Sequence, residues 1–133
     1  MYRQTSPRTE EGKKHMALAR YVGVSLDSDD PQAHADFYSR LLDAEISYSS
    51  ETFAFIQSAH LGFVKVEKHV APTWPNPDVP KQSHLELGVD DLDSGEAAIV
   101  ALGATKPEFQ PQPDRWRVLL DPAGHPFCIS TSI

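Results

Sequence analysis

The sequence nearly repeats itself at an offset of 61 residues, and this repeat limits the folds that are open to the chain. Four residues of the first copy, Leu26, Asp29, Asp30 and Leu41, recur as Leu87, Asp90, Asp91 and Leu102. Both copies have the pattern of a strand, an acidic turn and an amphipathic helix, so one supersecondary unit occurs twice. Because such a unit cannot bury its apolar face alone, we expect the two units to pack together.

Hydrophobic periodicity predicts the same order of elements in each unit. In the first unit we expect a strand at 19–26, a helix over 31–42 that starts at Asp29 or Asp30 with Pro31 in its first turn, and strands at 45–49, 52–57 and 62–68. In the second unit we expect a strand at 82–90, a helix over 92–102 ended by Gly103, and strands at 105–109, 115–120 and 126–131. The prediction is an α+β fold of two βαβββ units, 19–68 and 82–133, joined by a Pro-rich linker at 69–81.

Length and charge narrow the class of protein. The 133 residues suffice for one domain, and a formal charge of -7 argues against nucleic acids and membrane surfaces as partners, because both attract clustered Lys and Arg. No apolar run approaches the ~20 residues that span a bilayer, and the single Cys128 cannot form an internal disulfide, so we expect a cytoplasmic protein. Residues 1–18 are predicted to be a polar extension, and the sequence at His15-Met16 is typical of a cloning junction.

Three sequence blocks are similar to those of a known superfamily. They are His84–Asp93 (HLELGVDDLD), Ala101–Thr105 (ALGAT) and Asp121–Cys128 (DPAGHPFC). With the βαβββ repeat, they make the chain resemble the vicinal oxygen chelate superfamily of glyoxalase-like, bleomycin-resistance and extradiol-dioxygenase domains, in its small glyoxalase-like branch. The resemblance covers about 19–133 and implies a cupped mixed sheet around a small-molecule site. It does not select one function, because the superfamily contains several classes of enzyme as well as proteins that only sequester drugs.

The resemblance also places four metal-ligand positions, at Gly23, Glu67, His84 and Cys128. The 61-residue repeat relates Gly23 to His84 and Glu67 to Cys128. Gly23 has no donor atom, and Cys128 would replace a hard carboxylate by a soft thiolate. We therefore expect no catalytic metal. The alternative is a divalent Zn, Ni, Mn or Fe ion held by Glu67, His84 and Cys128, and a register slip of one residue at Glu67 would weaken it further.

The remaining site predictions concern the lining of the expected cup between the two units. His84 and Glu67 are the candidate catalytic residues, which either transfer a proton, contact ligand or simply pair with each other. The predicted ligand-binding residues are Phe63, Lys65, Glu86, Arg117 and Cys128. Arg117 is expected in the cup because Trp116 is expected under the helices; in the alternative, Trp116 stacks on a planar ligand. Trp74 either forms a flap over the opening or anchors the linker.

Three hypotheses for function follow. The leading one is a glyoxalase-like protein that binds a small molecule in the cup without a catalytic metal. The first alternative is a divalent-metal-dependent lyase, isomerase or dioxygenase of the same superfamily. The second alternative is a drug-sequestering resistance protein, which the acidic body of the chain favours because it would attract a cationic drug. The resemblance further implies a homodimer.

Overall fold

The computed structural model describes residues 9–10, 13–14, 17–74 and 76–131. Two short strands, β1 (Thr9–Glu10) and β2 (Lys13–Lys14), pair antiparallel ahead of the main fold. Most of the predicted N-terminal extension lies outside the described residues, so its proposed boundary at residue 18 stays a prediction. Neither α1 nor α2, the two α-helices of the described part, is long and apolar enough to cross a membrane.

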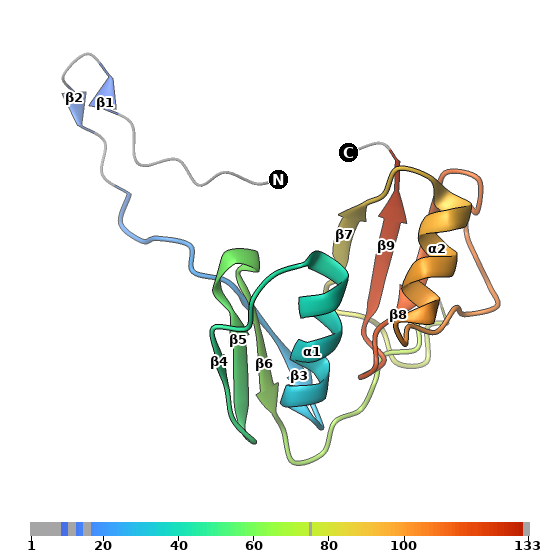
Figure 1. The fold of residues 1–133 in the computed structure, drawn as a ribbon, viewed down its shortest axis with the longest axis horizontal. Coiled ribbons are helices and arrows are strands. Elements are labelled where there is room, and N and C mark those ends of the chain that lie inside the picture. Colours follow the sequence, from blue (N-terminus) through green and yellow to red (C-terminus); the bar gives the residue numbers. More distant parts are fainter. Residues whose placement is uncertain (1–8, 11–12, 15–16, 75, 132–133) are drawn as a thin grey trace.

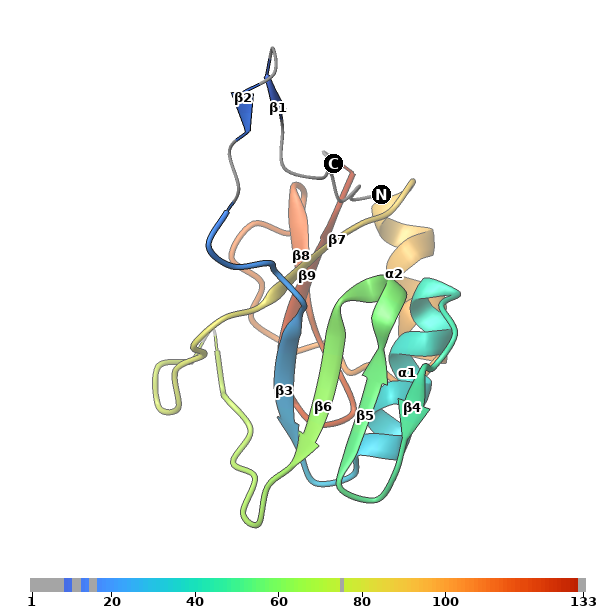
Figure 2. The ribbon, with the colours of Figure 1, turned by 90° about the vertical axis from the view of Figure 1, so that its left-hand side faces the viewer.

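The N-terminal unit forms a four-stranded mixed sheet covered by one helix. Its elements are β3 (Val24–Ser28), α1 (Pro31–Leu42), β4 (Tyr48–Ser49), β5 (Phe53–Ile56), the short 3₁₀ helix η1 (Gln57–Ala59) and β6 (Leu61–Lys65). The strand order is β3-β6-β5-β4, with β3 parallel to β6 and the other pairs antiparallel (Figure 2). This is the predicted βαβββ topology.

The C-terminal unit repeats this topology with a shorter sheet. Its elements are β7 (Leu85–Gly88), α2 (Leu92–Ala101), β8 (Trp116–Leu120) and β9 (Pro126–Ser130). The order is β7-β9-β8, and β7 runs parallel to β9. The prediction of a strand at 105–109 is wrong beyond its first residue, because only Thr105 forms a bridge, to Leu120. Pro107 has no N–H to donate, so the pairing does not continue. The α+β fold of two such units is confirmed.

The acidic residues before each helix act as the sequence predicts. The Asp30 carboxylate accepts a hydrogen bond from the Ala33 backbone N–H at 3.2 Å, and Pro31 occupies the first helical position. In the second unit, Asp91 accepts from the Ser94 N–H at 2.8 Å. Each carboxylate satisfies an amide that has no partner inside its helix, which fixes where α1 and α2 begin.

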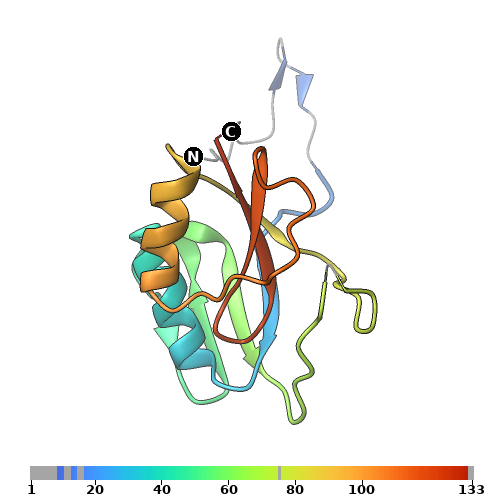
Figure 3. The ribbon, with the colours of Figure 1, turned by 90° about the vertical axis from the view of Figure 1, so that its right-hand side faces the viewer.

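Both helices lie on one side of the strands (Figure 3), and α1 lies between the N-terminal sheet and β9 (Figure 1). α1 packs on the N-terminal sheet and also reaches β9, where the rings of Phe37 and Phe127 approach to 6.3 Å between centroids. One core therefore joins the helix-covered faces of both sheets. Its buried residues are Ala35, Phe37, Tyr38, Ala54, Ile56, Leu61, Phe63, Ile99, Ala104, Leu119, Phe127 and Ile129. We call these sheet faces the helix faces and the opposite ones the outward faces.

This packing corrects the expected position of the cup. Because the helix faces share one core, the outward faces of the two sheets point away from each other (Figure 1). Within the described part of the chain, the pocket that contains His84, Glu86 and Cys128 is lined by the second unit and the linker and not by both units. A separate pocket lies where the units meet, with Ser25 and Asp27 from the first and His125 from the second.

A buried hydrogen-bonded contact joins the two units. Asp121, in the turn between β8 and β9, lies 2.6 Å from the His34 Nε2 of α1 and accepts a hydrogen bond from the Tyr38 hydroxyl at 2.8 Å. Its second oxygen accepts from the backbone N–H groups of Ala123 and His125. Burial raises the pKa of Asp121, but the hydrogen bond and charge of His34 and the hydrogen bond of Tyr38 lower it more, so the net pKa lies below its usual range.

The spacing between the two units changes along the chain. Val24 corresponds to Leu85, 61 residues later, but their partners across the parallel pair are Leu61 and Phe127, which are 66 residues apart. The connections inside the second unit are longer, so a constant offset fails in the last strand. The residue of the first unit that matches Cys128 is thus Gly62 and not Glu67, which corrects the predicted pairing of those two positions.

Candidate functional site

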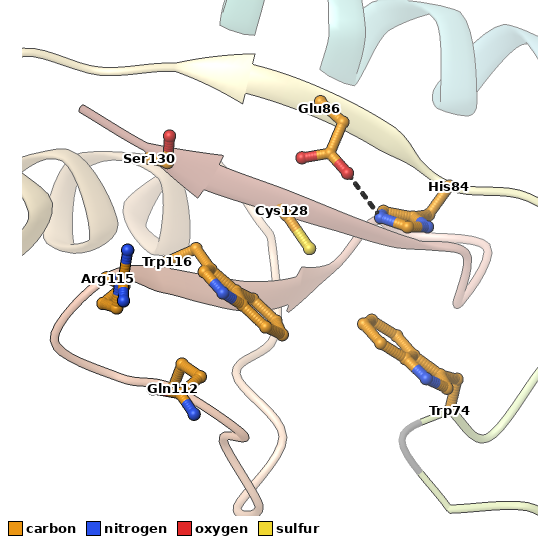
Figure 4. Close-up of a pocket in the computed structure, with 8 residues that line it drawn as sticks. All are labelled: Trp74, His84, Glu86, Gln112, Arg115, Trp116, Cys128 and Ser130. Atoms are coloured by element: carbon orange, nitrogen blue, oxygen red, sulfur yellow. Dashed lines mark hydrogen bonds and ion pairs between the residues drawn. The ribbon is translucent and has the colours of Figure 1, made fainter. Parts of the chain in front are cut away.

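The candidate site is a pocket of about 520 Å³ on the outward face of the C-terminal sheet. Strands β7, β8 and β9 form its floor, and residue 74 of the linker forms one wall (Figure 4). The lining residues are Trp74, His84, Glu86, Gln112, Arg115, Trp116, Cys128 and Ser130. The alternation of side chains along a strand explains the set: even-numbered residues of β7, β8 and β9 face outward, and odd-numbered ones face the helices.

Three polar side chains converge on the floor of this pocket. His84 precedes β7, Glu86 lies within it, and Cys128 is paired with Glu86 on β9. The His84 Nε2 lies 2.7 Å from a Glu86 carboxylate oxygen, which is a hydrogen bond (Figure 4). One ligand atom from each of the three residues lies within 4.8 Å of the others. The predicted site residues His84, Glu86 and Cys128 are therefore brought together.

The Cys128 thiol is buried and protonated at neutral pH. Burial, followed by the negative charge of Glu86, raises the pKa of Cys128 to about 11. Thiolate is the nucleophilic and metal-binding form of cysteine, so at neutral pH this side chain acts as a small polarisable wall of the pocket.

The metal site that the superfamily resemblance implies does not fit these residues. Gly23 offers no donor, and a Cβ built there would lie 2.8 Å from the His60 backbone oxygen, so no larger side chain fits without a backbone shift. Glu67 lies beyond the end of β6, exposed to solvent, and is not among the pocket residues. Of the four predicted ligand positions, Gly23 has no donor atom, for a steric reason, and Glu67 lies outside the pocket.

Phe63 and Lys65 also fall outside the pocket. Phe63 is fully buried on the helix face, with its ring stacked on Tyr38 at 5.6 Å between centroids. Lys65 is the exposed last residue of β6. Their expected place in the cup is corrected because the register of β6 differs by one residue from the one predicted for Glu67, which moves the odd-numbered residues of β6 to the helix face.

Trp116 and Arg117 exchange the places predicted for them. Trp116 lines the pocket, whereas Arg117 points to α2 and bonds Asp93 at 2.8 Å and Glu96 at 3.1 Å. Val118, although apolar, lies on the outward face with Trp116. Trp116 therefore lies on the pocket side of the sheet, which is the position that stacking on a planar ligand would require.

The pocket contains four residues that the sequence-based set did not include: Trp74, Gln112, Arg115 and Ser130. Ser130 lies two residues after Cys128, so strand alternation could have predicted it. Gln112 and Arg115 belong to a connection without regular structure, where no periodicity indicates a direction. Trp74 was noted as a flap or an anchor, and the structure gives it contact with the site through His84, at 5.3 Å between ring centroids.

Several solved structures share this fold. A glyoxalase/bleomycin resistance protein/dioxygenase family enzyme from Burkholderia phytofirmans PsJN matches with a TM-score of 0.61, at 20% identity over 84% of this chain and 97% of that one. The bleomycin-binding protein of Streptomyces verticillus, complexed with copper(II)-bleomycin, matches with a TM-score of 0.56, at 16% identity over 87% and 100%. The fosfomycin resistance protein FosX of Mesorhizobium loti gives 0.60, at 20% identity over 89% and 94%. These similarities establish the fold.

The sequence itself gives the family. Residues 23–130 match the profile of the glyoxalase-like domain. The chain therefore belongs to the glyoxalase-like domain family, within the vicinal oxygen chelate superfamily. No curated protein matches it.

Proposed function

We propose that this chain binds a small organic molecule in the pocket on the outward face of the C-terminal sheet, without a catalytic metal. The observation that supports this most directly is the convergence of His84, Glu86 and Cys128 on the floor of a concave site that Trp74 and Trp116 flank. A few convergent polar groups between aromatic walls are typical of small-molecule sites. The vacant Gly23 position supports binding by these side chains rather than by an ion.

A ligand-observed NMR screen of a fragment library against chelator-treated protein tests this proposal. We expect binders whose signals weaken with Glu86→Gln, which removes the charge that faces the pocket. Glu51→Gln makes the same change at an exposed residue outside the pocket and should leave binding unchanged. If no fragment binds, or if both variants behave alike, the proposal is wrong.

A metal-dependent lyase, isomerase or dioxygenase is the second candidate. It is supported by the three donor atoms of His84, Glu86 and Cys128 within 4.8 Å of one another, a donor set that zinc accepts. Elemental mass spectrometry after exposure to Zn, Ni, Mn and Fe(II) separates the candidates. Stoichiometric metal that disappears in His84→Ala would favour this second function, whereas protein that stays metal-free favours the first.

The third candidate is sequestration of a drug, the role that the name of the bleomycin-binding neighbour describes for that protein. The observation that favours it here is the exposed Glu86 carboxylate, which adds to the acidity of the chain at the site. Tight, salt-sensitive binding of a cationic antibiotic without turnover would support it. Binding that is indifferent to salt, or that leads to a product, would exclude it.

We further propose that the active form is a homodimer. The outward faces diverge within one chain, and the N-terminal one carries Tyr48, Phe53 and Phe55, of which Tyr48 is 57% exposed. A second copy that covers these aromatic residues would also enclose the open pocket. Light scattering should give twice the 14.7 kDa chain mass, and Tyr48→Glu should lower it to one chain. A wild-type mass of one chain would refute the dimer.

A further inference from the structure

Three rings of the pocket share nearly one orientation. The planes of Trp74 and Trp116 differ by 4°, with ring centroids 6.4 Å apart, and the planes of Trp74 and His84 differ by 23°. Figure 4 shows the two indoles on the same side of Cys128. Walls that are parallel in this way offer their faces to a flat molecule in one common orientation, whereas a puckered ring contacts them only through its protruding hydrogens.

Trp74 is held in position by hydrogen bonds within the linker. The Thr73 N–H donates to the Val79 carbonyl at 2.8 Å, and the Val79 N–H donates to the Thr73 hydroxyl at 2.8 Å. The Lys81 ammonium lies 4.1 Å from the centre of a Trp74 ring. These contacts hold the indole in place before any ligand arrives, so a stacking ligand meets a prepared wall.

Polar groups of opposite character lie at the two ends of the pocket. Figure 4 shows Glu86 on one side of Cys128, and Gln112 and Arg115 beyond Trp116 on the other. A carboxylate accepts hydrogen bonds, and a guanidinium donates them in a planar fork. A ligand that spans the pocket would therefore present a donor to Glu86 and an acceptor to Arg115.

From these three observations we infer the class of ligand: a flat aromatic molecule with a hydroxyl or amino group at one edge and a carboxylate at the opposite edge. This inference rests on the proposed function, since it names what the same pocket binds. The stacking surface is the exposed face of Trp116 or Trp74, because ring centroids 6.4 Å apart leave no space for a ligand between the two indoles. Glu86 and Arg115 orient the bound ring.

Two matched compounds test the inference on the wild-type protein. 4-Hydroxybenzoate and trans-4-hydroxycyclohexanecarboxylate carry the same groups at opposite ends of a six-membered ring, but only the first ring is flat. Titrations by NMR or calorimetry should show the flat compound bound about three- to tenfold more tightly, the usual gain from aromatic stacking. The larger 6-hydroxy-2-naphthoate should bind more tightly than either. Equal affinity for the flat and the saturated compound would overturn the inference.

Four variants locate the effect. Trp116→Leu should abolish the preference for the flat ring, whereas Trp116→Phe, which keeps a flat face, should retain most of it. Phe109→Leu makes the same kind of change at an aromatic residue that is 64% exposed and does not line the pocket, so it should have no effect. A preference that survives in both Trp116→Leu and Trp74→Leu would overturn the inference.

The outcomes separate this inference from the proposed function. Fragments that bind in a Glu86-dependent way without favouring flat rings would leave the proposed function standing and refute the ligand class. Failure of every fragment and of all three test compounds would refute both.

Discussion

The two units share a topology, apart from one strand that the C-terminal unit lacks among the described residues, but they differ on their outward faces. At matching places in the parallel strand pair, the N-terminal sheet has Ser25 beside Gly62, and the C-terminal sheet has Glu86 beside Cys128. The helix faces remain alike, since both are apolar and join one core. The comparison teaches that the fold constrains one side of each sheet through packing, while the other side is free to acquire a site in one unit and to lose it in the other.

The largest expected change in stability comes from a substitution at Phe63, which lies on the helix face of the N-terminal sheet. Phe63→Ala should lower the free energy of unfolding by about 3–5 kcal/mol, because it opens a cavity in the core. Ligand binding by the folded variant should not change. Phe55→Ala, on the outward face of the same sheet, is the control and should lose much less. Urea unfolding measures both, and equal losses would contradict the assignment of the two faces.

The contact between the units gives the next effect. Asp121→Asn should lower the free energy of unfolding by about 3 kcal/mol, because the charged acceptor for His34 and Tyr38 is lost. Since the pKa of folded Asp121 is lowered, its stabilisation is complete above the unfolded value of about 4 and is lost as the pH falls below it.

Urea unfolding at pH 7 and between about pH 5 and pH 2 measures this effect. The acid limb of the stability curve should be flatter in Asp121→Asn than in the wild type. Asp36→Asn, which breaks the exposed ion pair with Arg40, should change stability very little. Parallel acid limbs in wild type and Asp121→Asn would contradict the role of Asp121 as the joint between the units.

At equivalent positions of the two sheets, the C-terminal unit has the thiol of Cys128 and the N-terminal unit has Gly62, which has no side chain. A thiol whose pKa is raised from 9.0 to about 11 is alkylated roughly 100-fold more slowly at neutral pH than the same thiol in the unfolded chain, because far less thiolate is present. Mass spectrometry after iodoacetamide treatment at pH 7 to 9 measures this rate. Glu86→Gln should speed the reaction, since it removes the charge that helps to raise this pKa. A slower variant would contradict that electrostatic assignment.

The smallest expected effect on stability concerns Gly23 and His84, which occupy matching positions in the two units. Gly23→Ala should destabilise the fold by about 1–2 kcal/mol, because its methyl group meets the His60 backbone. His84→Ala should leave stability nearly unchanged, since the His84 side chain faces a pocket. Thermal unfolding compares them, and a harmless Gly23→Ala would mean that the first metal position is vacant for reasons other than space.

The sequence predicted the topology well because local signals determine it. The 61-residue repeat and the acidic residues before Pro31 and Leu92 mark the first strand and the helix of each unit, and both helices begin where those residues indicate. Each helix is preceded by two adjacent Asp residues that the sequence offers as caps, and in both units the second one, Asp30 or Asp91, is the cap.

The facing of the later strands could not be predicted in the same way. The apolar run Val118–Leu120 has no alternation that tells one face from the other, so Trp116 was assigned to the helices. Arg117 satisfies its charge on α2, a partner that the strand sequence does not reveal. The sequence does predict His84, Glu86 and Cys128 as site residues, because the alternating strand and the DPAGHPFC motif that contain them are clear signals. The position of Glu67 is predicted with the 61-residue offset, which fails in the last strand of the unit.

The linker between the units shapes the thermodynamics of any binding event at Trp74. Pro72, Pro77 and Pro80 have fixed φ angles, which restrict the conformations of this segment in the unfolded chain as well as in the folded one. Placing the indole therefore costs less conformational entropy than it would on a glycine-rich loop. A ligand that stacks there meets a segment whose conformations are already restricted, so less of the favourable enthalpy of its contacts is offset by a loss of conformational entropy.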